Sequence, residues 1–401
     1  MLRLPGPFRR YFPPVKRAVL RTTERAAPVT RRFSRVFGER ALPQGSAWET
    51  ADYAVCHPGG GVSVVPVAGP EELRRPLPEG DPPDHGVFAA HRSITTTPAF
   101  AATVQGGAVV GPYGAVLTED RTLLFDLSPY FGVFTPDHHP IYLRLRLPPE
   151  ERLPGTAAVL TTRGVDNYCH FLLDVVPRLH MLEAAGLAEG VDHYVVNRSL
   201  PFQRQILEQL GVPDDKVVES SAHPHLRCGR LVVSSLAGYD LQLPGWVVPH
   251  LRERLGPGAA PAAPRRRIYI SRGQTKNTRR VTNEAEVLTA LGRFGVTPVT
   301  PETLTVEEQI RLFSEAELIV APHGAALTNI VFCAAGATVV ELFAPDYVNS
   351  CFWALSCQVE GLRYRYLVGE GPLPNPGQAA LGVASDINVD VAKLTSLLER
   401  I

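Results

Sequence analysis

Three ionisable side chains recur at a spacing of four residues in the segment RGVDNYCHFLLDVVPRL: Asp166, His170 and Asp174. Residues four apart lie on one face of an α-helix, so a helix over 167–185 would bring the imidazole and the carboxylates together. A carboxylate beside an imidazole orients it or raises its basicity, which suits a general base. The structural alternative is that Asp166 caps the helix and His170 is an ordinary hydrogen-bonded histidine. Because the helix follows a predicted strand and would face a cleft, we favour the catalytic interpretation.

A cluster of basic residues follows another predicted strand, in the segment SRGQTKNTRRVTNE at 271–284. This loop holds Arg272, Lys276, Arg279 and Arg280. Guanidinium groups bind a diphosphate through paired hydrogen bonds, so the loop is a candidate phosphate site. A solvated basic loop is the alternative. Ligands bind at the carboxyl edge of a parallel sheet, and the place of this loop at that edge favours phosphate binding.

The segment LIVAPHGAALTNIVFCAAGATVVEL at 318–342 predicts a strand, a tight turn, a short helix and a second strand that ends in an acid. His323 stands at the first strand end, and Gly324 lets the backbone approach a ligand closely. The helix start that follows would present amide groups to an anion. Glu341, at the next strand end, is predicted to accept hydrogen bonds from ribose hydroxyls. The alternative is a tight turn with an acid that pairs with a nearby arginine.

Two α/β blocks would position these residues. Strands and helices alternate from about 155 to 254 and again from 268 to 341, which predicts largely parallel sheets. Between the blocks, GPGAAPAAPRRR at 256–267 has the composition of a linker, which implies a cleft between two domains. Two helix starts in the second block carry capping-box pairs, Asn283 with Glu286 and Thr305 with Glu308.

The composition is that of a globular protein, with 45% hydrophobic and 20% charged residues among 401. The net charge of +0 gives no field that would favour nucleic acid. The six cysteines lack CxxC spacing, and the histidines lack HExxH spacing, so no metal site is predicted. Without a recognisable export signal, the expected compartment is the cytoplasm.

The first forty residues are rich in arginine and contain only Glu24 and Glu39 as acids. No apolar run approaches the roughly 18 residues that a membrane helix needs. The segment is predicted to be a solvated basic tail. The alternative is peripheral contact with anionic lipid at the inner face of the membrane, or with an acidic partner.

The motifs DNYCHFLLDVVPRL, ISR, VTNE, APHGAALTNIVF and VVELF together resemble glycosyltransferase family 61, over about residues 155–343. The resemblance implies a GT-B-like fold, in which two Rossmann-like domains face each other across a cleft. It also implies inverting, metal-independent transfer of a sugar from a nucleotide donor, expected to be UDP-linked, to a hydroxyl of a polysaccharide or glycan acceptor. Capsule-type polysaccharide biosynthesis with a lipid-linked acceptor fits this picture, and no cofactor is expected.

The resemblance also implies roles for individual residues. Asp166, His170 and Asp174 would lie on the acceptor side, and Cys169 departs from the aromatic or other residue of many relatives. Our own hypothesis is that His170 or Asp166 is the base and that Asp174 orients it. The residues implied to contact the nucleotide diphosphate are Arg272, Arg279, His323, Gly324, Ala325, Asn329 and Glu341.

Five segments are expected. They are a basic tail (1–45), an acceptor-side domain (46–255) with a strand-rich extension before the Rossmann-like block, a linker (256–267), a nucleotide-sugar domain (268–350) and a C-terminal segment (351–401) that packs back on the acceptor-side domain. Two other functions remain open: a nucleotide-sugar epimerase on a similar scaffold, and a non-catalytic subunit that binds UDP-sugar.

Overall fold

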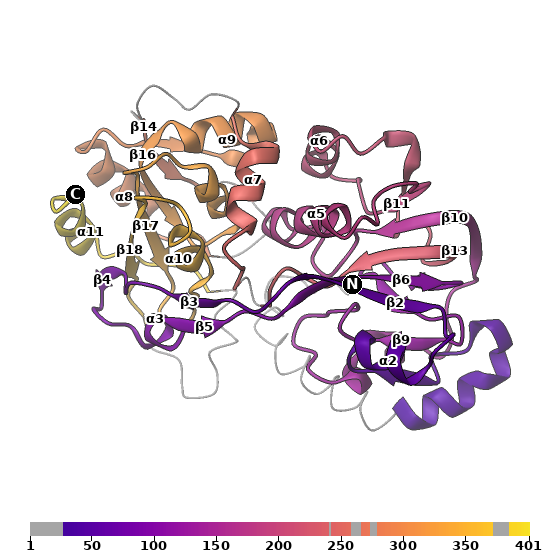
Figure 1. The fold of residues 1–401 in the computed structure, drawn as a ribbon. Coiled ribbons are helices and arrows are strands. Elements are labelled where there is room, and N and C mark those ends of the chain that lie inside the picture. The colour runs from indigo at the N-terminus through magenta and orange to yellow at the C-terminus, as the bar shows by residue number, and fades with distance from the viewer. Residues whose placement is uncertain (1–26, 240–241, 258–265, 273–278, 372–384) are drawn as a thin grey trace. The chain divides into compact units, whose positions relative to one another are not determined.

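The computed structural model describes residues 27–239, 242–257, 266–272, 279–371 and 385–401 (Figure 1). The chain forms two compact units that are each discontinuous in sequence. Unit 1 contains Glu72–Thr95 and the described residues from 242 to the C-terminus, and unit 2 contains 27–71 and 96–239. Unit 1 therefore includes two segments, 72–95 and 242–255, that we expected in the acceptor-side domain. Most of the predicted linker (258–265) lies outside the described residues.

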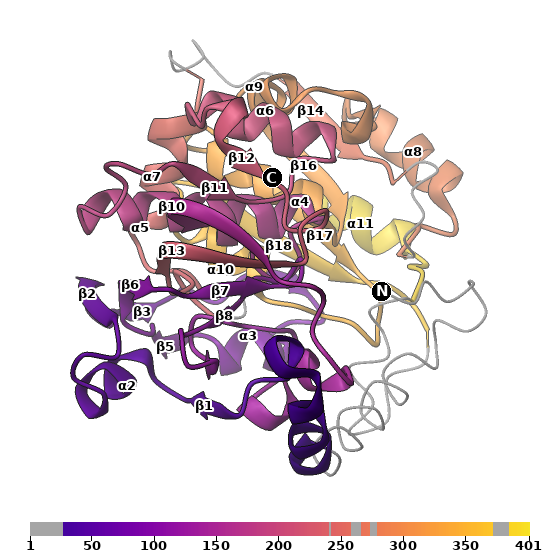
Figure 2. The ribbon, with the colours of Figure 1, turned by 90° about the vertical axis from the view of Figure 1, so that its right-hand side faces the viewer.

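Unit 2 is built on a mixed sheet of ten strands. Four strands from the predicted α/β block are parallel neighbours in the order β13-β10-β11-β12 (Figure 2). The chain before that block adds antiparallel strands to β13, so the predicted strand-rich extension joins the same sheet. The strands are β1 (Gly45–Ala47), β2 (Val62–Ala68), β6 (Ala99–Gln105), β7 (Ala108–Val110), β8 (Ala115–Leu117), β9 (Thr122–Leu124), β10 (Glu151–Val159), β11 (His193–Val195), β12 (Val217–Val218) and β13 (His225–Ser234).

The helix predicted over 167–185 is present, but it has three parts. It begins as α4 (Tyr168–His170), continues through a π-helical turn, η5 (Phe171–Val175), and ends as α5 (Val176–Ala184). The N-cap is Asn167, whose side chain accepts from the amides of Cys169 and His170 at 2.9 and 3.4 Å. The alternative of a cap at Asp166 is therefore wrong, because Asp166 lies one residue earlier and is exposed.

The remaining helices of unit 2 are short. They are η2 (Arg35–Arg40), α2 (Thr50–Cys56), η3 (Pro136–His138), η4 (Pro140–Leu143), α6 (Pro201–Gln209) and η6 (Asp214–Lys216). The helix α6 corresponds to the helix predicted at 201–210.

Unit 1 is built on a parallel sheet of six strands in the order β15-β14-β16-β17-β18-β4. The strands are β4 (Glu79–Asp81), β14 (Arg266–Ile270), β15 (Thr297–Val299), β16 (Ala316–Pro322), β17 (Thr338–Phe343) and β18 (Arg363–Val368). A separate two-stranded sheet consists of β3 (Glu72–Arg74) and β5 (Ser93–Thr95). The helices are α3 (Gly86–Ala90), α7 (Val247–Leu255), α8 (Glu284–Gly292), η7 (Pro301–Thr303), α9 (Val306–Ser314), η8 (Ala325–Phe332), α10 (Cys351–Ser356) and α11 (Val391–Leu398). The predicted α/β class is thus confirmed.

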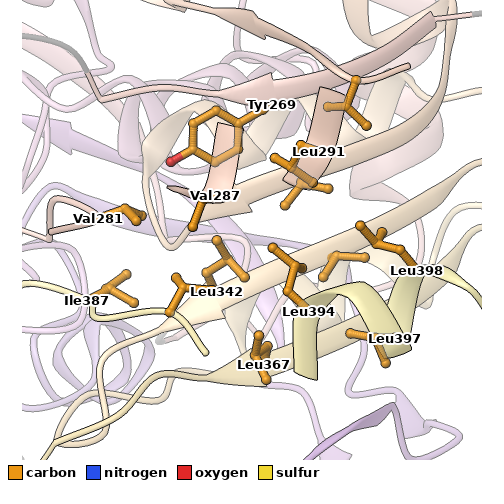
Figure 3. Close-up of a cluster of buried hydrophobic side chains, with 14 of the residues drawn as sticks. Tyr269, Val281, Val287, Leu291, Leu342, Leu367, Ile387, Leu394, Leu397 and Leu398 are labelled. Carbon is orange, nitrogen blue, oxygen red and sulfur yellow. The ribbon is translucent and has the colours of Figure 1, made fainter. Parts of the chain in front are cut away.

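The last helix, α11, belongs to the core of unit 1. Its residues Leu394 and Leu397 are buried together with Leu291 of α8 and Leu342 of β17 (Figure 3). The buried apolar face of α11 thus packs within unit 1. The C-terminal segment also contacts residues 72–95, which we expected in the acceptor-side domain: Lys393 pairs with Asp81 at 3.1 Å.

The two predicted capping boxes have different outcomes. Thr305 and Glu308 form the reciprocal pair at the start of α9. Asn283 is the N-cap of α8, but its side chain makes no capping bond. Instead, its amide group exchanges two hydrogen bonds with the backbone of Val389, at 2.8 and 3.0 Å. The Asn283 side chain therefore bonds to the backbone just before α11 and not to the amides at the start of α8.

None of the helices that the structure describes is long and apolar enough to cross a membrane.

Candidate active site

In unit 1, the strands β16 and β17 bring His323 against Glu341. Their register pairs Ala321 with Glu341, which sets the histidine just past the strand end beside the acid. His323 Nδ1 lies 2.5 Å from Glu341 Oε1, and the second carboxylate oxygen accepts a hydrogen bond from the Tyr364 hydroxyl. Glu341 is 0% exposed, and each of its oxygens makes one of these contacts. Glu341 thus orients the histidine, and its contact with ribose hydroxyls stays a prediction.

Aromatic side chains surround the His323 ring. It stacks on Phe343 at 5.4 Å between ring centroids, and it contacts Tyr347 and Phe352 at 5.3 and 5.1 Å. Burial lowers the pKa of His323 below its ordinary value, although Glu341 acts in the opposite direction. The imidazole is therefore neutral near pH 7. Because a carboxylate only accepts, the proton lies on Nδ1, and Nε2 is left as an acceptor.

Arg272 lies against the same turn. Its Nη1 donates to the carbonyl oxygen of His323 at 3.0 Å. A Cβ atom on Gly324 would lie 2.4 Å from that nitrogen, so a larger residue would have to move the guanidinium from this position. The backbone of Gly324 is extended, so its conformation does not require glycine. Glycine here allows the approach of an arginine, and the close backbone approach to a ligand stays a prediction.

Arg272 and Arg279 are cations without an ion-pair partner among the described residues. The Nε atom of each is buried and makes no hydrogen bond there. Burial, and then the charge of Arg279, lowers the pKa of Arg272 to about 10. Arg279 has a left-handed backbone (φ 71°), and its guanidinium lies 5.6 Å from the ring centre of Tyr347. Two such cations in one place are costly unless an anion joins them.

The short helix η8 starts beside these arginines. Its N-cap, Gly324, has no side chain that could satisfy the first amides, among them that of Ala325. Asn329 is 0% exposed, and its amide donates to Gln309 Oε1 at 3.2 Å and to the Ala326 carbonyl at 3.3 Å. These contacts fix η8 against α9, and the predicted contact of Asn329 with the nucleotide diphosphate stays a prediction.

We name the group of His323, Glu341, Tyr364, Arg272 and Arg279 the His323 cluster. It lies wholly in unit 1. The basic loop between Arg272 and Arg279 (273–278, with Lys276) lies outside the described residues.

A second histidine–carboxylate pair lies in unit 2. His170 Nδ1 is 3.0 Å from Asp174 Oδ2, and Asp174 is 1% exposed. The buried Arg178 lies one turn further on, and it donates to the carbonyl oxygen of Thr161 at 2.9 Å. Burial lowers the pKa of Arg178 to about 10, and the charge of Asp174 counteracts this shift. The shared face of His170 and Asp174 is thus confirmed, and exposed Asp166 precedes the helix that carries them.

Three further residues beside His170 were missed from the sequence. The Phe131 ring meets the His170 ring edge-on at 4.8 Å, and the guanidinium of Arg163 lies 4.6 Å from the centre of the Phe131 ring. Gly164 has φ 71°, and a Cβ atom there would lie 3.0 Å from the His170 ring. The Arg-Gly pair just before VDNYCH was the available signal. We name His170, Asp174, Arg178, Phe131 and Arg163 the His170 cluster.

Arg163 is the unusual member of the His170 cluster. It is 4% exposed, and its Nε atom is buried without a hydrogen-bond partner in the described structure. Its described contacts include the Phe131 ring but no carboxylate. In the same described residues, no group of three or more histidine, cysteine or acidic side chains could hold a metal ion.

Comparison with known proteins shows a family resemblance in part of the chain. Residues 168–340 match the family model described as Glycosyltransferase 61. The match starts in α4 and ends in β17, so it includes the His170–Asp174 pair and the strand end at His323. Over these residues the chain is similar to glycosyltransferases of family 61.

The chain is similar to protein O-linked-mannose beta-1,4-N-acetylglucosaminyltransferase 2 of several mammals. The human protein is 35% identical over 113 residues, which cover 26% of this chain and 19% of the human protein. The mouse protein is 40% identical over 102 residues, which cover 25% of this chain and 17% of the mouse protein. The similarity thus spans less than a fifth of the length of these relatives.

Proposed function

We propose that this chain transfers a sugar from a nucleotide donor, UDP-linked, to a hydroxyl of a glycan acceptor, with inversion and without a metal ion. The observation that carries the proposal is the pair of half-buried arginines, Arg272 and Arg279, whose Nε atoms are buried without a hydrogen bond in the described structure, beside an uncapped helix start. A diphosphate supplies the missing charge, and guanidinium groups bind it in a fork geometry.

In this mechanism the His323 cluster stabilises the leaving nucleotide diphosphate. Negative charge grows on the diphosphate as the bond to the sugar breaks, and Arg272 with the amides at the start of η8 would neutralise it. Neutral His323 offers an acceptor nitrogen, so it would accept from a hydroxyl of the donor and leave the phosphates to the arginines. Glu341 and Tyr364 hold the ring in that orientation.

The acceptor hydroxyl would be deprotonated by His170. Asp174 fixes the ring through Nδ1, so Nε2 is the atom that takes the proton as the hydroxyl oxygen attacks the anomeric carbon. The new bond forms on the side opposite the leaving diphosphate, which inverts the anomeric centre. We assign the base to His170 over Asp166, because Asp174 holds the imidazole in place while Asp166 lies outside the helix. In this proposal, as in a GT-B-like enzyme, unit 1 binds the donor and unit 2 binds the acceptor.

The relatives carry N-acetylglucosaminyltransferase in their names. This supports UDP-N-acetylglucosamine as the first donor to test. The matched part of those proteins is short, and the walls that would select the sugar are separate from the diphosphate contacts.

A panel of nucleotide-sugars tested by thermal unfolding examines the donor half. A ligand that binds the folded state raises the unfolding temperature, and Arg272→Gln should abolish the rise. Arg266→Gln is the matched control, because Arg266 is exposed and pairs with Glu315 on the surface of the same unit. The proposal is wrong if no nucleotide-sugar raises the unfolding temperature, or if Arg272→Gln responds like the control. Isomerisation of the donor without an acceptor would favour the epimerase alternative.

A further inference from the structure

An unusual apolar surface lies at the N-terminal end of the described chain. Residues 27–34 are helical and lead into η2, the indigo helical segment at the lower right of Figure 1. Ala27 and Ser34 are buried, while Val29, Phe33 and Val36 are 55%, 70% and 80% exposed. The exposed residues are spaced four and three apart, so they share one face of a helix. This segment turns an apolar stripe toward solvent.

The segment 134–147 extends the stripe. It contributes three exposed apolar side chains, Phe134, Leu143 and Leu145. The two segments are joined, because Arg40 and Leu147 exchange hydrogen bonds at 2.8 and 2.9 Å. Arg31 also pairs with Asp137 at 2.6 Å, and Arg146 lies over the Phe37 ring.

These two joined segments carry the exposed apolar side chains that we together name the apolar face. Of the twelve large hydrophobic side chains that are exposed in the described part of the chain, seven belong to it: Val29, Phe33, Val36, Phe37, Phe134, Leu143 and Leu145. Such a concentration of exposed apolar groups marks an interaction site.

Positive charge is interleaved with the apolar face. Arg32, Arg35 and Arg146 are exposed, and of the two nearby acids Glu39 is exposed and Asp137 pairs with Arg31. The sequence that precedes this segment adds more cations: residues 1–26 carry six arginines and Lys16 against one acid, Glu24. A second copy of this face would meet it with like charge, so self-association is disfavoured. Apolar side chains flanked by arginines suit a surface of anionic phospholipid, in which the hydrocarbon receives the former and phosphates the latter.

We propose that the apolar face binds anionic phospholipid membranes from one side. Phe33, Val36 and Leu145 would enter the boundary between headgroups and acyl chains, while Arg32, Arg35 and Arg146 would contact lipid phosphates. The inference is independent of the sugar-transfer proposal, because none of these residues belongs to the His323 or His170 cluster. It adds an expectation about the acceptor: a lipid-linked glycan would be met at the membrane surface.

Co-sedimentation of the full chain with vesicles tests this proposal. Vesicles of phosphatidylcholine alone and of phosphatidylcholine with 30% phosphatidylglycerol should differ at least tenfold in the fraction of protein bound, and high salt should reduce the difference. The triple variant Phe33→Ser, Val36→Ser, Leu145→Ser should lose at least tenfold in binding to the anionic vesicles. Val55→Ser is the matched control, because Val55 is 79% exposed in the same unit but outside the apolar face.

Two further measurements test whether the apolar face itself enters the membrane. Phe33→Trp should shift its fluorescence to the blue on addition of anionic vesicles, whereas Val55→Trp should not. Deletion of residues 1–26 separates the basic sequence from the apolar face, and some binding should survive that deletion. The proposal is overturned if the full chain ignores anionic vesicles, or if the triple variant binds like the control. It is also overturned if gel filtration shows a dimer that the triple variant abolishes.

Discussion

His170 Nδ1 lies 3.0 Å from Asp174 Oδ2, one helical turn further along the chain. The same relationship recurs between His323 Nδ1 and Glu341 Oε1, where the two residues come from adjacent strands. In both pairs the carboxylate is almost fully buried and contacts Nδ1 of the ring. Each unit therefore holds one imidazole in a fixed orientation.

Asp174→Asn should lower sugar transfer by about 10²-fold or more, because the amide can still accept from Nδ1 but no longer stabilises a charged imidazole. The donor constant KM should stay unchanged, since Asp174 lies outside the His323 cluster. Initial rates over a range of acceptor concentrations measure both. Asp214→Asn is the control, because Asp214 pairs with Arg198 on the surface. A variant Asp174→Asn with full turnover would remove Asp174 from the mechanism.

Gly324→Ala should weaken nucleotide binding roughly tenfold, the loss of about one charge-assisted hydrogen bond. The added methyl group would lie 2.4 Å from Arg272 Nη1 and would displace the guanidinium. Gly292→Ala is the matched control, since nothing lies within 4 Å of the Cβ position there. Titration calorimetry with UDP measures the difference. Equal affinities for the two variants would contradict the role of Arg272.

Tyr364→Phe should lower the free energy of unfolding by about 1–3 kcal/mol, because it leaves a buried oxygen of Glu341 without its donor. Tyr113→Phe should lower it less, since the buried Tyr113 hydroxyl meets no hydrogen-bond geometry in the described structure and has Arg144 beside it. Urea unfolding of both variants measures the contrast. A Tyr364→Phe variant as stable as the parent would mean that the Glu341 oxygen finds another donor.

Arg163→Met and Arg178→Met should change stability in opposite directions. Arg163 is buried with no ion pair in the described structure, so its replacement by an apolar chain should stabilise the fold by about 1 kcal/mol or more. Arg178 is also buried, but it donates hydrogen bonds to the carbonyl oxygens of Thr161, Val159 and Leu127. Methionine would leave these oxygens without a donor, so Arg178→Met should destabilise the fold. Arg163→Met should also reduce transfer, since a cation retained at such a cost beside His170 indicates a use. The unfolding temperature and the transfer rate of both variants are measured. A lower unfolding temperature for Arg163→Met would contradict the expected stabilisation.

Stability should fall in acid through the buried histidines. Burial lowers the pKa of His139 from 6.5 to about 3, so between these values the unfolded chain binds a proton that the folded chain does not. The free energy of unfolding therefore decreases as pH falls through this window, by up to about 1.4 kcal/mol per pH unit for one such group. His139→Asn retains an acceptor for the Ile141 amide and should flatten the slope measured by urea unfolding at pH 7 and 5. Exposed His57→Asn should leave the slope as it is, and an equal slope for His139→Asn would refute the assignment.

Local sequence patterns predicted the parts of the structure that depend on nearby residues. The helix that carries His170, the strand before His323 and the capping box of Thr305 with Glu308 all follow from spacings within a few residues. The π-helical turn at 171–175 leaves the α-helical spacing intact at His170 and Asp174, so the sequence carried no sign of it.

The errors arose where distant segments compete for the same atoms. Asn283 bonds to Val389, which is 106 residues away, and this displaces the expected capping bond. The sequence also carried no sign that Tyr364, from the next strand, donates to the second oxygen of Glu341. The sequence did not single out Arg163. What distinguishes this arginine is that it is buried without a carboxylate partner among the described residues, and the sequence alone cannot show which residues surround it.

The central claim is that donor binding and deprotonation of the acceptor belong to different clusters. His170→Gln tests it most directly, in a single-turnover transfer assay with saturating UDP-sugar in which bound donor is measured in the same sample. We expect His170→Gln to bind the donor as tightly as the parent protein does and to transfer the sugar at least 10²-fold more slowly. Full turnover by His170→Gln, or a loss of donor binding in step with the loss of transfer, would contradict it.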